Sequence, residues 1–125
     1  MNKILLVDDE DRMVELLKLY LQPHGYSCDS VNSGAKAKQY IKEHNVELIL
    51  MDVMMPGKNG WDTVKEIRAF SNVPIFMITA RDQYPDIINS LQSGANGHIA
   101  KPFNEKQLLF HIEKLIEDSL TMREN

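Results

Sequence analysis

Acidic, hydroxyl and ammonium side chains follow four separate apolar runs of this 125-residue sequence. Asp8 and Asp9 come directly after "ILLV", Asp52 after "LILM", Thr79 after "PIFMI" and Lys101 after "HIA". Carboxylates that face one another raise one another's pKa, so this set of acids requires a positive partner. A hard dication such as Mg²⁺, which takes oxygen ligands and typically one or two protein carboxylates, meets that requirement.

A phosphoryl group is the anion that such a set of side chains could hold. Lys101 would supply a second positive charge, and Thr79 a hydroxyl donor for the phosphoryl oxygens. Asp52, at the centre, has the chemistry of a nucleophile for phosphoryl transfer. Glu10 and Asp11 are interpreted as ordinary acids of a first helical turn. Each residue taken alone is more typical of a cap, a turn or a surface charge, so the prediction depends on their joint positions.

Two alternating periodicities predict the elements that position these residues. Short aliphatic runs are separated by segments whose apolar residues recur at helical spacing, which is typical of βα units on a parallel sheet. Five helices are expected between and after five strands, which are predicted at Lys3–Val7, Ser27–Val31, Val46–Met51, Val73–Ile78 and Gly97–Ala100. The strand that begins at Ser27 mixes polar and apolar residues and is expected at an edge. Ligands of such sheets bind beyond the carboxyl ends of the strands, where the candidate residues lie.

Length and composition favour one α/β domain over residues 1–120, followed by a polar tail or linker stub at 121–125. The net charge is −4, and Lys and Arg are scattered, so direct contact with nucleic acid is not expected. The single cysteine, Cys28, excludes an internal disulfide and suits a reducing cytoplasm, where it is expected to be a small buried side chain. The longest apolar runs are only strand-sized, so neither membrane spanning nor secretion is expected.

Four segments together resemble the receiver domain of bacterial two-component response regulators, the CheY-like family. They are "ILLVDDE", "LILMDVMMPGKNGWD", "PIFMITA" and "SGANGHIAKPF", and the likeness extends from Lys3 to about Leu120. The resemblance implies a doubly wound, flavodoxin-like (βα)5 domain with a five-stranded parallel sheet in the order 2-1-3-4-5.

The resemblance also implies a role for each candidate side chain. Asp52 would accept a phosphoryl group from a phosphohistidine of a sensor histidine kinase. Asp9 would coordinate Mg²⁺ (or Mn²⁺) directly and Asp8 through water, while Asp52 and the backbone carbonyl of Met54 would complete the protein ligands. The domain would therefore be a phosphoacceptor, with only self-catalysed phosphotransfer and dephosphorylation, and not an enzyme acting on other substrates.

The remaining family positions concern the change that follows phosphorylation. Thr79 would hydrogen-bond the phosphoryl group and move towards it, Lys101 would form an ion pair with it, and the Lys101–Pro102 peptide would be cis. His98 stands where the family usually has Tyr or Phe. An offset of three along a strand places it on the face opposite Lys101, towards the fourth helix. We expect either a switch ring that responds to pH between about 6 and 7 or a histidine with a fixed hydrogen bond.

The expected output is a changed surface of the fourth helix, fifth strand and fifth helix. This surface would control a C-terminal DNA-binding domain or another downstream protein. In the winged-helix subfamily an acidic turn pairs with basic residues across a dimer, but Asn96 and His98 replace its acidic and aromatic residues, and the fifth helix lacks the arginines. Dimerisation through that face on phosphorylation therefore stays an open alternative.

Several other readings of the site are weaker or stay open. A dehalogenase-type phosphatase would need a second acid where Met54 stands, and a flavodoxin-like flavin carrier would bring its phosphate against Asp8 and Asp9. A stand-alone receiver that acts through protein contacts and a receiver-like module that is never phosphorylated both remain open.

Overall fold

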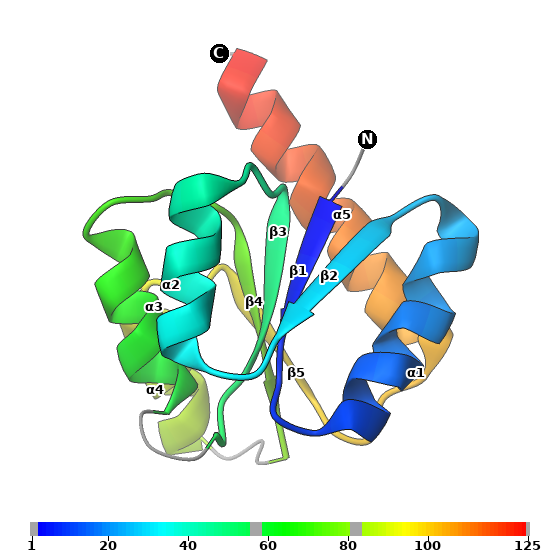
Figure 1. Cartoon of the computed structure of the whole chain (residues 1–125), viewed down its shortest axis with the longest axis horizontal. Helices are drawn as coiled ribbons and strands as arrows, with labels where there is room; N and C mark the ends of the chain where they lie inside the picture. Colours follow the sequence, from blue (N-terminus) through cyan, green and yellow to red (C-terminus); the bar gives the residue numbers. More distant parts are fainter. Residues whose placement is uncertain (1–2, 56–58, 81–83, 125) are drawn as a thin grey trace.

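A five-stranded parallel sheet forms the centre of the molecule (Figure 1). The computed structural model describes residues 3–55, 59–80 and 84–124. The strand order is β2-β1-β3-β4-β5, which confirms the predicted order. The strands are β1 (Lys3–Val7), β2 (Ser27–Val31), β3 (Leu48–Asp52), β4 (Ile75–Thr79) and β5 (Gly97–Ala100). As expected, β2 lies at an edge and β1 and β3 lie inside the sheet.

Helices cover both faces of this sheet, as the doubly wound prediction requires (Figure 1). One face carries α1 and α5, and the other carries α2, α3 and α4 (Figure 1). The helices are α1 (Asp11–Leu21), α2 (Gly34–Glu43), α3 (Gly60–Arg68), α4 (Tyr84–Ser93) and α5 (Glu105–Glu124), and a short 3₁₀ helix, η1 (Gln22–His24), follows α1. Within the described ranges, no helix combines the length and the apolar character needed to cross a lipid bilayer.

Strand alternation divides the buried side chains into two cores. Ile4 and Leu6 of β1 point into the core under α1 and α5, whereas Leu5 and Val7 point into the core under α2 and α3. Cys28 is buried in the first core as a free thiol, which confirms its interpretation as a small buried side chain. Because both faces of the inner strands are buried, their sequences are apolar at nearly every position.

Two strands end later than the sequence predicts. β3 runs over Leu48–Asp52 rather than Val46–Met51, and β4 over Ile75–Thr79 rather than Val73–Ile78. Hydrogen bonding to neighbouring strands sets these bounds, since Asp52 pairs with Ile78. Two candidate site residues are therefore the last residues of buried strands, where the sheet holds their backbones.

The segment expected as a polar tail or linker stub, residues 121–125, begins within the last helix. α5 continues to Glu124, so residues 121–124 are helical. Three of these four residues, in the sequence "TMRE", are good helix formers, which favours continuation of the helix.

Candidate functional site

Asp8 and Asp52 lie on the same face of the sheet, at the ends of adjacent strands. In β1 the side chains of Ile4 and Leu6 point to the α1/α5 face, and Asp8 continues that alternation. In β3, Leu48 and Leu50 do the same before Asp52. Val7 pairs with Met51, so the register sets the next positions, Asp8 and Asp52, side by side.

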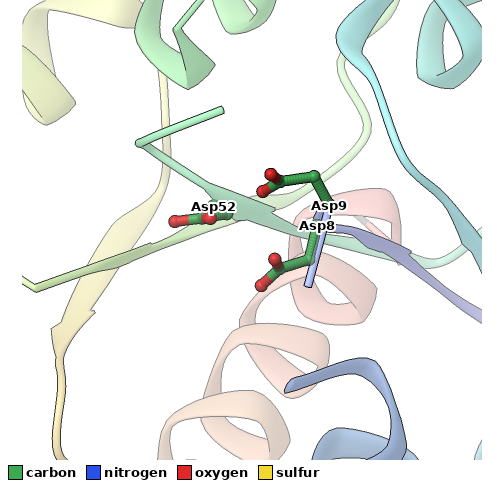
Figure 2. A group of neighbouring side chains, drawn as sticks. All are labelled: Asp8, Asp9 and Asp52. Carbon is green, nitrogen blue, oxygen red and sulfur yellow. The ribbon is translucent and has the colours of Figure 1, made fainter. Parts of the chain in front are cut away.

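Asp9 joins these two residues to form one carboxylate cluster. Oxygen atoms of Asp8, Asp9 and Asp52 all lie within 4.8 Å of one another. Figure 2 shows Asp8 and Asp9 at the end of β1, with their carboxylates directed to the same region as that of Asp52. Asp8 and Asp52 are only 4% and 5% exposed, whereas Asp9 is open to solvent. The cluster therefore has two buried acids and one that solvent can reach.

One oxygen of this cluster has no partner within the described protein. Oδ1 of Asp8 accepts a hydrogen bond from the backbone N–H of Glu10 at 2.9 Å, but Oδ2 of Asp8 is buried and unpaired. A buried carboxylate oxygen without a donor is costly, by about 1–3 kcal/mol or more. A bound cation would satisfy it, so the residues present fit a hard divalent metal ion.

The electrostatics of the cluster also favour a bound cation. Burial, together with the charge of Asp8, raises the pKa of Asp52 to about 6. Burial also raises the pKa of Asp8. Both carboxylates are destabilised as anions in the protein alone, so added positive charge at this place is favourable.

Lys101 supplies part of that positive charge. Its Nζ lies 3.8 Å from Oδ1 of Asp52, and it lowers the pKa of that carboxyl, although by less than burial raises it. The Lys101–Pro102 peptide is cis, which is the isomer that the resemblance implies. The backbone N–H of Met54 also donates to Oδ1 of Asp52, at 3.3 Å. Asp52 is thus held by contacts from two loops.

The other two predicted residues occupy different positions. Thr79 is buried at the end of β4, the strand next to β3, and is therefore at the same edge of the sheet as the cluster. His98 is half-buried in β5 beside Met77, on the face that α2 and α3 cover. This face of the sheet also carries α4 (Figure 1), and the role of His98 as a switch stays a prediction.

Sequence reasoning missed two features next to the site. An open, largely apolar pocket of about 380 Å³ lies beside Lys101 and is lined by Met13, Leu16, Lys101, Pro102 and Phe103. Gly60 packs against the peptide of Asp52: a Cβ there would lie 2.4 Å from the Asp52 carbonyl oxygen. A glycine at the first position of a helix was the available signal, but its contact across the loop was not visible in the pattern.

Comparison with known proteins decides the family. The family model described as the response regulator receiver domain matches residues 4–113. The chain belongs to this family. Among solved structures, the response regulator TrrA of Thermotoga maritima, in complex with Mg²⁺ and BeF, is 34% identical to this receiver domain, with a TM-score of 0.83. The match covers 92% of this chain and 99% of the other.

Curated relatives of the receiver domain are longer proteins. The CpxR homolog of Haemophilus influenzae, a transcriptional regulatory protein, is 41% identical over 100% of this chain and 55% of its own length. The DNA-binding response regulator MtrA of Mycolicibacterium smegmatis is 36% identical over 89% of this chain and 49% of its own length. The receiver domain thus spans about half the length of the curated relatives it matches.

Proposed function

We propose that this receiver domain is a signalling switch that accepts a phosphoryl group on Asp52 from a phosphohistidine of a sensor histidine kinase. The observation that carries the proposal is the environment of Asp52. A buried carboxylate stands 3.8 Å from the ammonium of Lys101, in a cluster where Oδ2 of Asp8 has no partner among the described residues. This arrangement combines a nucleophile, a cation and open metal-binding capacity at one sheet edge.

The chemistry follows from these groups. A carboxylate oxygen of Asp52 attacks phosphorus, the new O–P bond forms as the P–N bond breaks, and the imidazole nitrogen keeps the electron pair and takes a proton. Lys101 balances the charge of the phosphoryl oxygens, and the hydroxyl of Thr79 donates a hydrogen bond to one of them.

A divalent cation completes the proposed site. Asp9 and Asp52, the carbonyl of Met54 and, through water, Asp8 would hold Mg²⁺ or Mn²⁺. The ion supplies positive charge that offsets the repulsion between the carboxylates and the incoming phosphoryl group.

The proposed output is control of a further domain or protein, because the matched relatives are transcriptional and DNA-binding response regulators of about twice this length. In this proposal the receiver contacts the kinase and the output partner in the cytoplasm, without contacting nucleic acid itself. It turns over only its own phosphoryl group. A homodimer formed on phosphorylation is one way in which the signal could reach the output.

Incubation with acetyl phosphate, with and without Mg²⁺, tests the proposal by intact-protein mass spectrometry. We expect Mg²⁺-dependent gain of one phosphoryl group by the wild type and by Asp62→Asn, a control that removes an exposed aspartate from α3. Asp52→Asn should gain none. Equal labelling of Asp52→Asn, or no labelling of the wild type, would contradict the proposal, and the second result would favour an unphosphorylated binding module.

A further inference from the structure

The first turn of α3 packs directly against the peptide of Asp52. The backbone N–H of Gly60 donates to the carbonyl of Val53 at 2.8 Å. A Cβ on Gly60 would lie 2.4 Å from the carbonyl oxygen of Asp52 and 3.0 Å from Cε of Met77. There is no room for even a Cβ between Gly60 and the Asp52 peptide, so a shift of the Asp52 backbone in this direction would press on the start of α3.

The next residue along α3 connects this turn to α4. Nε1 of Trp61 donates a hydrogen bond to Oγ of Ser90 at 2.9 Å. Ser90 is 1% exposed, and the Trp61 ring packs against the core under α2 and α3. Because the serine hydroxyl is buried, water cannot replace the indole N–H as its partner, so loss of this hydrogen bond destabilises the contact.

A stronger attachment joins the other end of α3 to the turn that follows α4. Nε of Arg68 donates to the carbonyl of Gly94 at 2.9 Å, and Nη2 donates to Oδ1 of Asn96 at 3.0 Å. Hydrogen bonds from a charged donor are roughly twice as strong as neutral ones. Gly94, whose carbonyl group accepts the bond from Arg68, has φ of +103°, a backbone conformation that residues other than glycine rarely adopt.

These contacts hold α4 unequally. The turn after Ser93 is fixed by a charged side chain with two acceptors, whereas one turn earlier Ser90 is held to α3 by a neutral hydrogen bond. Movement of α4 relative to α3 would therefore break the bond at Ser90 first and pivot near Gly94.

We propose that the Trp61–Ser90 hydrogen bond couples Asp52 to α4. The bond stabilises the arrangement in which Asp52 is unmodified, and it is weakened when Asp52 carries a phosphoryl group. This inference rests on the proposed function and adds the route by which phosphorylation of Asp52 affects α4. Trp61 and Ser90 are positioning residues in this proposal, since neither touches the carboxylate cluster.

Linkage gives a measurable consequence. If the bond favours the unmodified arrangement, removing it must tighten the binding of a ligand that favours the other arrangement. Beryllofluoride with saturating Mg²⁺ is the probe, because it forms a phosphoryl-like adduct with a carboxylate. We expect Ser90→Ala to lower its apparent Kd about two- to tenfold, the range given by loss of one hydrogen bond.

Ser93→Ala is the matched control. Ser93 is a buried serine of the same helix, but its Oγ donates to the carbonyl of Ser90 within α4 and does not reach α3. Its Kd should equal that of the wild type. Trp61→Phe keeps a ring and removes the donor, so it should tighten binding as Ser90→Ala does. The double variant should gain no more than either single one.

Tryptophan fluorescence gives a second readout, since Trp61 is the one tryptophan of the sequence. Addition of beryllofluoride and Mg²⁺ should change the emission of the wild type and of Ser93→Ala, and the change should be largely lost in Ser90→Ala. Unchanged or weaker beryllofluoride binding by both Ser90→Ala and Trp61→Phe would overturn the coupling, while acetyl phosphate labelling of Asp52 in the same variants would leave the proposed function standing. Absence of labelling in the wild type would overturn both.

Discussion

Nζ of Lys101 lies 3.8 Å from Oδ1 of Asp52, although the two residues come from different strand ends. Lys101 is partly exposed and Asp52 is buried, so the pair joins a reachable cation to a shielded carboxylate. Lys101 is also a group that lowers the pKa of Asp52. Its charge therefore affects both the nucleophile and the phosphoryl group that the site is proposed to hold.

Lys101→Met should reduce labelling of Asp52 by acetyl phosphate by about ten- to a hundredfold, the range expected for loss of a charged hydrogen bond. The variant keeps the length of the side chain and removes its charge. The rate of mass gain with Mg²⁺ present measures the effect. Lys106→Met, at an exposed position of α5, should label at the wild-type rate. A wild-type rate for Lys101→Met would remove the lysine from the proposed mechanism.

Asp52→Asn should be more stable than the wild type in the presence of a chelator. The pKa of Asp52 in the folded protein, about 6, is above the ordinary value of 3.8, so the folded state binds this proton more tightly. The wild type therefore loses stability as the pH rises from about 4 to about 6, and Asn lacks this loss. Urea unfolding at pH 8 should show a gain of about 1–3 kcal/mol. Equal stability of the two proteins at pH 8 would show that burial and the charge of Asp8 do not destabilise the Asp52 anion.

Magnesium should reverse part of that repulsion. A cation that binds only the folded protein raises the unfolding midpoint in proportion to the logarithm of its concentration. We expect this rise in the wild type and in Glu10→Gln, which changes an acid of the same run outside the three-residue cluster. Asp9→Asn and Asp8→Asn should lose most of it in thermal unfolding with added Mg²⁺. Glu10→Gln is the control and should show the wild-type rise. If Asp9→Asn also keeps the full rise in unfolding midpoint, Mg²⁺ does not bind at this site.

Gly60→Ala should destabilise the domain by about 1–3 kcal/mol, because an added methyl group meets backbone atoms that cannot move independently. The carbonyl oxygen of Asp52 is the atom in the way, at 2.4 Å. Lys65→Ala, on the exposed side of α3, provides the control and should change stability by less than about 0.5 kcal/mol. Chemical unfolding of both variants in the same buffer compares them. A Gly60→Ala protein as stable as the control would show that α3 can move away from Asp52 freely.

Local patterns were sufficient to predict the strands and helices, whereas the strand order came from the resemblance to receiver domains. The runs at Ile4, Leu48 and Ile75 indicated buried strands because both faces of a covered parallel sheet are apolar. Three strands, β1, β2 and β5, have the predicted bounds. The carboxyl ends of β1, β3 and β5 bring Asp8, Asp9, Asp52 and Lys101 together. The bounds of β3 and β4 were wrong by one or two residues, because pairing with a neighbouring strand, and not apolar character, ends a strand.

The sequence by itself determined which residue types stand at the strand ends, since strand periodicity and chain order are local properties. Tertiary structure decided which atoms of these side chains have hydrogen-bonding or ionic partners. Only the folded arrangement leaves Oδ2 of Asp8 buried and without a partner among the residues that the structure describes, and only helix packing brings Trp61 to Ser90, 29 residues away. Such contacts depend on how each helix is rotated and placed against the sheet, and many distant side chains set that packing together.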